Sequence, residues 1–331
     1  MPRRVVDLRF SGRALLDIAS YGRSAGRPLT PTQRRQITLT VGRAPEVIVK
    51  VSGGARSLRG VEAHLAYIGR EGELGIETDN AFRLAGKTFQ KQIVADWDLD
   101  LWAHRIQNAR SIRGQRRPAK LVHNLIFSMP PRTSPDKVLK AVRRLAENEF
   151  ALKHRYVMVL HTDEPHPHVH VVVKSVSEQG ERLNIRKATL RHWREQFATY
   201  LREQGVAANA TERAVRGQYT ARKKDAIYRA IRRAESTHEQ KEMADLANKS
   251  PTVIQRYSLG KEKLVRTRSQ VVAGWQAIEY RLQEEGDFGL ADKVSLFVAR
   301  MPPPVTEQEQ LARKMLRENP VRERTPLERT R

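Results

Sequence analysis

Alternating apolar and polar positions mark the strands that the sequence predicts. Short runs of β-branched and aliphatic residues, bounded by Gly, Pro or polar residues, are typical of strands in a sheet. The segments with this pattern are 46–52, 121–128, 156–162, 168–174 and 182–185, and a glycine-bearing stretch at 71–84 has room for two more short strands. We therefore predict a central antiparallel sheet.

Apolar residues at helical spacing lie between these strands. Residues 57–69 place Val61, Leu65 and Ile68 on one stripe, as expected of a helix that packs on a core. Further helices are predicted at 88–110, 134–150 and 189–204. The second of these starts at Ser134, a residue type that suits an N-cap.

The pattern divides the chain into three regions. Residues 1–45 are rich in Arg, interrupted by Gly and Pro, and only weakly periodic, so we expect a basic, loosely ordered N-terminal arm. Residues 46–205 hold the predicted sheet and its flanking helices. Residues 206–331 form a basic helical C-terminal region with a frayed tail, and its helical segments are predicted near 220–247, 266–285 and 305–317. The predicted fold class is α+β, a central antiparallel sheet with flanking helices followed by this mainly helical region.

The densest chemistry lies in the hairpin predicted from 156–162 and 168–174. A four-residue loop at 164–167 would place Asp163 opposite His168 and His161 opposite His170. Because side chains alternate between the two faces of a strand, all four residues then share one face. Directly opposed residues have Cβ atoms about 4.5–5.5 Å apart, so the sequence predicts a metal site or an acid–base site here.

Three imidazoles with one open position suit a divalent metal that acts as a Lewis acid. Imidazole accepts several divalent ions, so the choice among Mg, Mn and Zn is left open by the ligands. We assign His161, His168 and His170 as the ligands because they share a face. His166 falls in the loop, out of register, and Asp163 can orient either a ligating histidine or a nucleophile.

The net positive charge of the chain indicates the kind of partner that it binds. The chain carries 61 Lys and Arg against 37 Asp and Glu, a formal net charge of +24 spread along its whole length. Such an excess favours polyanions, because binding to phosphates releases counterions. The absence of cysteine excludes disulfides, thiolate nucleophiles and cysteine-based zinc sites. No apolar run approaches the roughly 18 residues that a membrane span needs, and the N-terminus lacks the apolar segment of a signal peptide. We expect a soluble, cytoplasmic protein without membrane insertion.

Three motifs occur in order within 46–205 and carry a resemblance. The first motif, at 62–70 along and just after the predicted helix, reads Glu-Ala-His-Leu-Ala-Tyr-Ile-Gly-Arg. The second, in a later strand, reads His-Asn-Leu-Ile-Phe-Ser-Met-Pro and includes Ser128. The third, in the hairpin, reads His-x-Asp-x4-His-x-His followed by Val-Val-Val-Lys. This combination resembles the conjugative relaxases, or mobilization nucleases, of the HUH endonuclease superfamily. It is most similar to the type that nicks the borders of tumour-inducing plasmids. The chain departs from the family pattern in the extra His166.

The resemblance implies a reaction and its participants. Tyr67 stands at the position of the catalytic tyrosine, which attacks a phosphodiester of single-stranded DNA at the origin of transfer and forms a 5′-phosphotyrosyl intermediate. His64 and Ser128 are candidates for contact with the tyrosine or the DNA. The implied partners are relaxosome accessory proteins and a type IV secretion coupling protein, with export of the protein attached to the transferred DNA.

Other readings stay open at this point. A rolling-circle replication initiator shares the same chemistry, and a non-enzymatic accessory DNA-binding protein with a structural metal site fits the charge equally well. His161-x-Asp163 also begins the ligand set of non-haem iron oxygenases, but those enzymes draw their last histidine from a distant strand. The helices that surround the hairpin also argue against the all-β fold of such enzymes.

Overall fold

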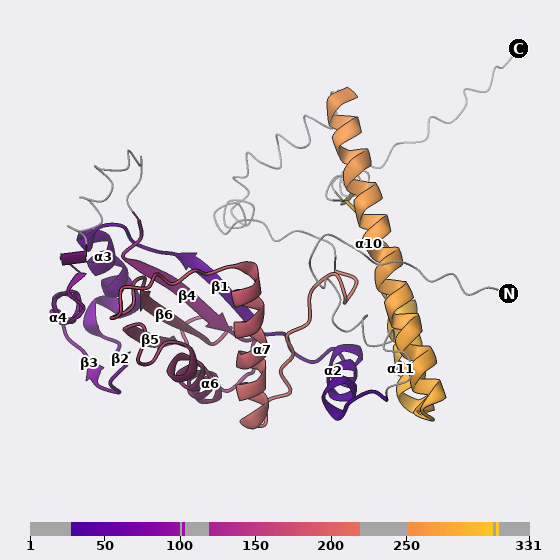
Figure 1. Ribbon diagram of the computed structural model, residues 1–331, viewed down its shortest axis with the longest axis horizontal. Helices are drawn as coiled ribbons and strands as arrows, with labels where there is room; N and C mark the ends of the chain where they lie inside the picture. The colour runs from indigo at the N-terminus through magenta and orange to yellow at the C-terminus, as the bar shows by residue number, and fades with distance from the viewer. Residues whose placement is uncertain (1–27, 100, 103–118, 219–250, 307–308, 311–331) are drawn as a thin grey trace, which may run out of the picture. The chain divides into compact units, whose positions relative to one another are not determined.

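A computed structural model describes residues 28–99, 101–102, 119–218, 251–306 and 309–310 (Figure 1). It divides into two compact units. The sheet unit is Arg43–Ala210, and the helical unit consists of the described parts of 1–42 and 211–331. The two units are treated separately below.

The sheet unit is built on six antiparallel strands, which confirms the predicted fold class. The strand order is β1-β4-β6-β5-β2-β3, and neighbouring strands are antiparallel throughout. The strands are β1 (Ile48–Gly53), β2 (Ile76–Thr78), β3 (Arg83–Leu84), β4 (Val122–Ser128), β5 (Tyr156–His161) and β6 (His168–Lys174). The helices of this unit are α3 (Leu58–Ile68), the 3-10 turn η1 (Arg70–Gly72), α4 (Phe89–Asp96), α6 (Pro135–Glu149) and α7 (Lys187–Glu203).

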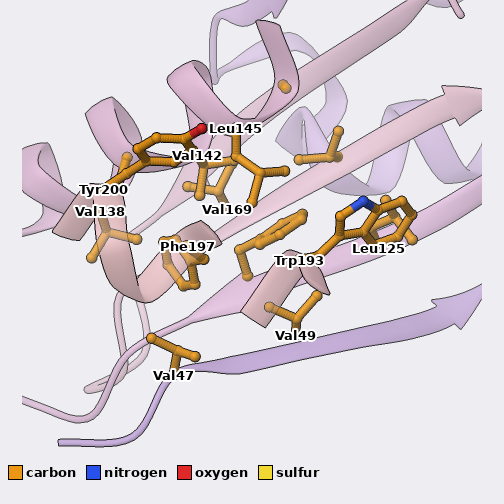
Figure 2. Packing of buried hydrophobic residues seen from close by; sticks show 14 of the residues in the cluster. Val47, Val49, Leu125, Val138, Val142, Leu145, Val169, Trp193, Phe197 and Tyr200 are labelled. Atoms are coloured by element: carbon orange, nitrogen blue, oxygen red, sulfur yellow. The ribbon is translucent and has the colours of Figure 1, made fainter. Parts of the chain in front are cut away.

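Both faces of the sheet are covered by helices, because each strand of its centre is apolar on both sides. Alternate residues of β1, β4, β5 and β6 pack with α6 and α7 in one core, where Trp193 and Phe197 are fully buried (Figure 2). The other residues of β4, β5 and β6 pack with α3 and α4 in a second core that contains Val157, Val159 and Val172. At about 25 cal/mol per Å² of buried apolar surface, these two cores supply the main favourable term for folding of the unit.

Helix α3 forms as the sequence predicts. The Ser57 side chain accepts a hydrogen bond from the Gly60 amide at its start, and Gly69 is the C-cap at its end. Val61, Leu65 and Ile68 are its buried residues. The helix is therefore held by its apolar stripe, and the rest of its surface is available for other contacts.

Other local predictions differ from the structure. The segment 182–185 makes only an isolated bridge, Val176 to Arg182, and adds no strand to the sheet. The Ser134 residue is the N-cap of α6, yet its side chain makes no capping hydrogen bond within the described part of the chain. The helix predicted at 88–110 is ordered as α4 over Phe89–Asp96, and residues 103–110 lie outside the described residues.

The helical unit joins segments from opposite ends of the chain. Its helices are α2 (Pro31–Val41), α10 (Pro251–Glu284) and α11 (Phe288–Ala299), and its core includes Ile37, Trp275 and Phe297. The prediction of a loosely ordered arm over 1–45 is wrong for α2, where the Thr30 side chain caps the helix in a capping box and Ile37 is buried. Residues 1–27 and the predicted helix at 220–247 lie outside the described residues, as does most of the one at 305–317. Helix α11 was not predicted. None of the described helices is both long and apolar enough to cross a membrane.

Candidate active site

The β5–β6 hairpin carries the predicted histidines, but in a different register. His161 pairs with His168 and Val159 pairs with His170, so the loop covers the six residues 162–167 rather than four. The predicted pairing of Asp163 with His168 is therefore wrong, and Asp163 lies beyond the end of β5. The register differs from the prediction by two residues, and a shift by two keeps every side chain on the same face. The three histidines thus still share one face of the sheet.

The imidazole rings of these histidines form a compact cluster. The ring centroids of His161 and His170 lie 4.6 Å apart, and His168 lies 5.1 Å from each of them. One nitrogen from each ring can be chosen so that all three lie within 4.8 Å of one another. This spacing lets three nitrogens converge on a single cation.

Backbone carbonyls orient two of the three rings. His161 Nε2 donates to the Ile68 carbonyl oxygen at 2.7 Å, and His168 Nδ1 donates to the His166 carbonyl oxygen at 3.0 Å. Because a carbonyl only accepts, these bonds fix the tautomers and leave His161 Nδ1 and His168 Nε2 with free lone pairs. The orienting bonds are of the kind that metal-ligating histidines commonly make through their second nitrogen.

Burial favours the neutral form of the His161 and His170 rings. Burial, followed by the neighbouring His161 and His168, lowers the pKa of His170 to about 3. Burial also lowers the pKa of His161. His170 Nδ1 is buried and finds no hydrogen-bond partner among the described residues, a costly arrangement for a group without a ligand. Neutral imidazoles with free lone pairs are the form that binds a metal, so the residues fit a divalent ion.

Tyr67 lies beside this cluster. Its ring centroid is 6.5 Å from that of His170 and 6.3 Å from that of His64, which lies on the same helix. The Tyr67 side chain is 55% exposed although its neighbour Ile68 is fully buried. A tyrosine that serves only packing would be covered; this one is accessible to a ligand at the cluster.

Two contacts join the end of α3 to the hairpin. The first is the hydrogen bond from His161 to the Ile68 carbonyl. The second is an ion pair between Arg70 and Asp163, and the guanidinium carbon of Arg70 also lies 5.6 Å from the centroid of the Tyr67 ring. Burial would raise the pKa of Asp163, but a backbone hydrogen bond and Arg70 outweigh it and hold this pKa below its ordinary value. Sequence reasoning gave Arg70 no role; its position three residues after Tyr67, just beyond Gly69 at the end of the helix, was the available signal.

The remaining candidates lie at different distances from the cluster. Ser128 pairs with His168 in the β4–β6 ladder, so it lies on the same face of the sheet, and it is buried. The His64 ring lies 6.4 Å from the His170 ring, and burial lowers the pKa of His64. His166 is exposed in the loop, and its carbonyl oxygen orients His168. The structure thus brings His64 and Ser128 to the cluster and leaves the His166 side chain outside it.

Comparison with known proteins shows what the sheet unit is similar to. Residues 84–206 match the nuclease domain of MobA/VirD2-like relaxases. The resemblance to relaxases is confirmed. This match includes the three histidines and begins after Tyr67, so the role of Tyr67 rests on geometry and on the first motif.

Two border-nicking relaxases are similar over a longer stretch. The chain is 26% identical over 222 residues to the T-DNA border endonuclease VirD2 of Agrobacterium fabrum and 24% identical over 222 residues to that of Rhizobium radiobacter. The alignments cover 62% of this chain and 48% and 51% of those relatives. The chain therefore spans about half the length of the curated relaxases that it matches.

Proposed function

We propose that this protein is a DNA-nicking relaxase in which Tyr67 is the nucleophile. The observation that carries the proposal is the exposed Tyr67 ring, 6.5 Å from the ring of His170 in a cluster of three histidines. The match of residues 84–206 to a relaxase nuclease domain supports the same reaction class. The named activity of the two relatives, T-DNA border endonuclease, is consistent with it.

The proposed reaction is a transesterification. The Tyr67 oxygen forms a bond to phosphorus while the bond from phosphorus to the 3′-oxygen breaks, and the phenolic proton is balanced by the proton gained by the leaving oxygen. The products are a 5′-phosphotyrosyl link and a free 3′-hydroxyl. Because the energy of the phosphodiester is kept in the new ester, the same site can reseal the strand.

The metal would be held by His161, His168 and His170. A divalent ion at such a site withdraws charge from phosphate oxygens as a Lewis acid. Mn, Mg and Zn all remain candidates, and an all-imidazole ligand set favours Mn or Zn over Mg by softness. Burial lowers the pKa of His161 and of His170, and the Ile68 and His166 carbonyls orient the rings of His161 and His168.

We assign the other candidates supporting roles. Asp163 contacts Arg70 rather than Tyr67, so it acts on the nucleophile indirectly. Ser128, beside His168 at the end of β4, is placed to contact a phosphate of the bound strand. His64 flanks both Tyr67 and His170 and would contact the nucleophile or the DNA.

The proposed substrate is single-stranded DNA at an origin of transfer, in the conjugative transfer of a plasmid or integrative element. The net charge of +24 favours a polyanionic partner. We propose that the sheet unit cuts and that the basic regions outside it contact DNA, relaxosome accessory proteins or a type IV coupling protein. This role places the protein in the cytoplasm before transfer.

One comparison tests the nucleophile. Wild type and Tyr67→Phe are incubated with Mn²⁺ and a single-stranded oligonucleotide that carries the cognate nick site, and covalent adducts are resolved on denaturing gels. We expect a protease-sensitive adduct with wild type and none with Tyr67→Phe. Tyr280→Phe is the matched control, because Tyr280 is similarly exposed, at 53%, but lies on α10 in the helical unit. An adduct with Tyr67→Phe would move the nucleophile elsewhere, and no adduct with wild type would favour the accessory DNA-binding role.

A further inference from the structure

Tyr67 lies on the last turn of α3, and Arg70 follows the C-cap Gly69 as the first residue of η1. Its guanidinium pairs with Asp163 in the β5–β6 loop and lies over the Tyr67 ring at 5.6 Å. Asp163 Oδ1 in turn lies 3.9 Å from Nδ1 of His161, the nitrogen left free by the bond to Ile68. Arg70 thus lies between the Asp163 carboxylate, which is beside the histidine cluster, and the Tyr67 ring.

We propose that Arg70 is a positioning residue through which Asp163 holds the Tyr67 ring beside the histidine cluster. This inference rests on the proposed function, because it assigns Arg70 to the same reaction. It differs from that function in predicting a coupling between two side chains that is measurable without metal or DNA.

The Arg70–Asp163 ion pair is exposed to solvent, which favours a role in orienting the Tyr67 ring over a role in stability. The side chains of Arg70 and Asp163 are 35% and 50% exposed, and ion pairs this accessible to solvent contribute little to the free energy of unfolding. A planar guanidinium can pair with a carboxylate through one edge while its face or rim lies against an aromatic ring. The Tyr67 side chain, exposed on the helix surface, would otherwise be free to change rotamer.

The backbone supports the same assignment. Arg70 and Glu71 have φ values of +50° and +52°, in the left-handed region that residues other than glycine rarely adopt. Such conformations persist where surrounding contacts hold them, and they cluster at functional sites. Here the turn follows Gly69, the C-cap of α3, and the Arg70 side chain within it pairs with Asp163 of the hairpin loop.

The chain contains a matched control for this arrangement. The Arg144 guanidinium carbon lies 5.1 Å from the centroid of the Tyr200 ring, and Arg144 pairs with Glu203 at 2.7 Å. These residues lie on α6 and α7, the helices on the face of the sheet away from the histidines. Arg144→Gln therefore removes an equivalent arginine–tyrosine–carboxylate contact without touching the site.

The first test uses the full-length protein without metal or DNA. Tyrosine rings are labelled with ¹³C, and the Tyr67 signal is assigned by its absence from Tyr67→Phe. We expect Arg70→Gln and Asp163→Asn to shift or broaden the Tyr67 signal, and Arg144→Gln to change the Tyr200 signal alone. An unchanged Tyr67 signal in both site variants would overturn the inference, whether or not the protein cuts DNA.

The second test measures cleavage at saturating oligonucleotide. We expect Arg70→Gln to slow cleavage about 10- to 100-fold, the range for losing a group that orients a reacting side chain. Oligonucleotide affinity and the unfolding midpoint should change far less. Arg70→Lys keeps the charge but not the planar fork and should recover part of the rate, while Arg144→Gln should cleave as wild type does.

A double-mutant cycle decides whether Asp163 acts through Arg70. If it does, the Arg70→Gln/Asp163→Asn double variant is no slower than Arg70→Gln alone, because the shared interaction is already lost. Rate losses that multiply would mean that Asp163 acts independently, and the inference would be wrong. If wild type itself formed no adduct, the proposed function would fail and the ring signals alone would decide the coupling.

Discussion

On the face of the sheet that packs against α6 and α7, the residues of the central strands are apolar along most of their length, and His123 is a polar exception. On the opposite face, Val157 and Val159 of β5 precede His161, and Val172 of β6 follows His168 and His170. Both faces obey the same alternation and are anchored by helices. The two faces differ in what their helices contribute. Helix α3 and the turn η1 after it place an exposed tyrosine and an arginine beside the histidines, whereas α6 and α7 bring apolar side chains to the other face. The face that packs on α6 and α7 therefore stabilises the unit. The opposite face packs on α3 and α4 and also carries the candidate active-site residues.

The largest effect should come from removing a histidine of the cluster. We expect His170→Gln to slow cleavage on the order of 10³-fold, or about 4 kcal/mol of transition-state stabilisation. The variant should also bind Mn²⁺ more weakly in calorimetry, with an unfolding midpoint near that of wild type in the absence of metal. Cleavage at the wild-type rate would show that the histidine face does not carry the chemistry.

A core substitution on the other face should have the reverse profile. Leu145 on α6 is fully buried, so Leu145→Ala should lower the free energy of unfolding by about 3 kcal/mol. At temperatures well below its unfolding midpoint, Leu145→Ala should cleave DNA at the wild-type rate. Leu65→Ala makes the same change at a fully buried leucine of α3, the helix that carries Tyr67, and should lower both stability and cleavage. Equal losses of cleavage in the two variants would remove the distinction between the faces.

The smallest effect concerns His123, the polar exception on the apolar face. Burial, and then the charges of Lys120, Arg182 and His154, lower its pKa to about 4. The unfolded chain binds this proton near pH 6.5, so the free energy of unfolding falls as the pH drops from about 6.5 to about 4. Because the ring is partly exposed, we expect its share to be about 1 kcal/mol.

Urea unfolding at a pH above about 6.5 and at a pH below about 4 measures the contribution of His123 to the free energy of unfolding. His123→Asn should lose about 1 kcal/mol less than wild type on acidification, since it has no proton to take up. Its cleavage at neutral pH should be unchanged, because His123 lies on the face away from the cluster. An identical acid loss in both proteins would assign the effect to other groups.

Much of the sheet unit could be predicted from the sequence because its signals are local. The cap residues Ser57 and Gly69 and the stripe of Val61, Leu65 and Ile68 place α3 within a residue or two. The common face of His161, His168 and His170 follows from alternation alone. This prediction holds although the predicted register was wrong by two residues, because side chains two residues apart on a strand point to the same face.

Other features depend on contacts between distant segments. Helix α2 has little apolar periodicity of its own, and the structure buries its Ile37 in a core with α10 and α11, more than 200 residues later in the chain. Its Arg34 also pairs with Glu285 and Asp287. No pattern within residues 31–41 predicts the contacts of this helix with α10, α11, Glu285 and Asp287.

The sequence by itself determined the class of the fold, the shared face of the three histidines and the helix that carries Tyr67. All three follow from periods of 2 and 3.6 residues, which any segment displays without its neighbours. Only the tertiary structure decided the hairpin register, the partner of Asp163 and the place of Arg70 over the Tyr67 ring. These depend on how the end of α3 meets a loop more than 90 residues away, and local periodicity carries no information about such an approach.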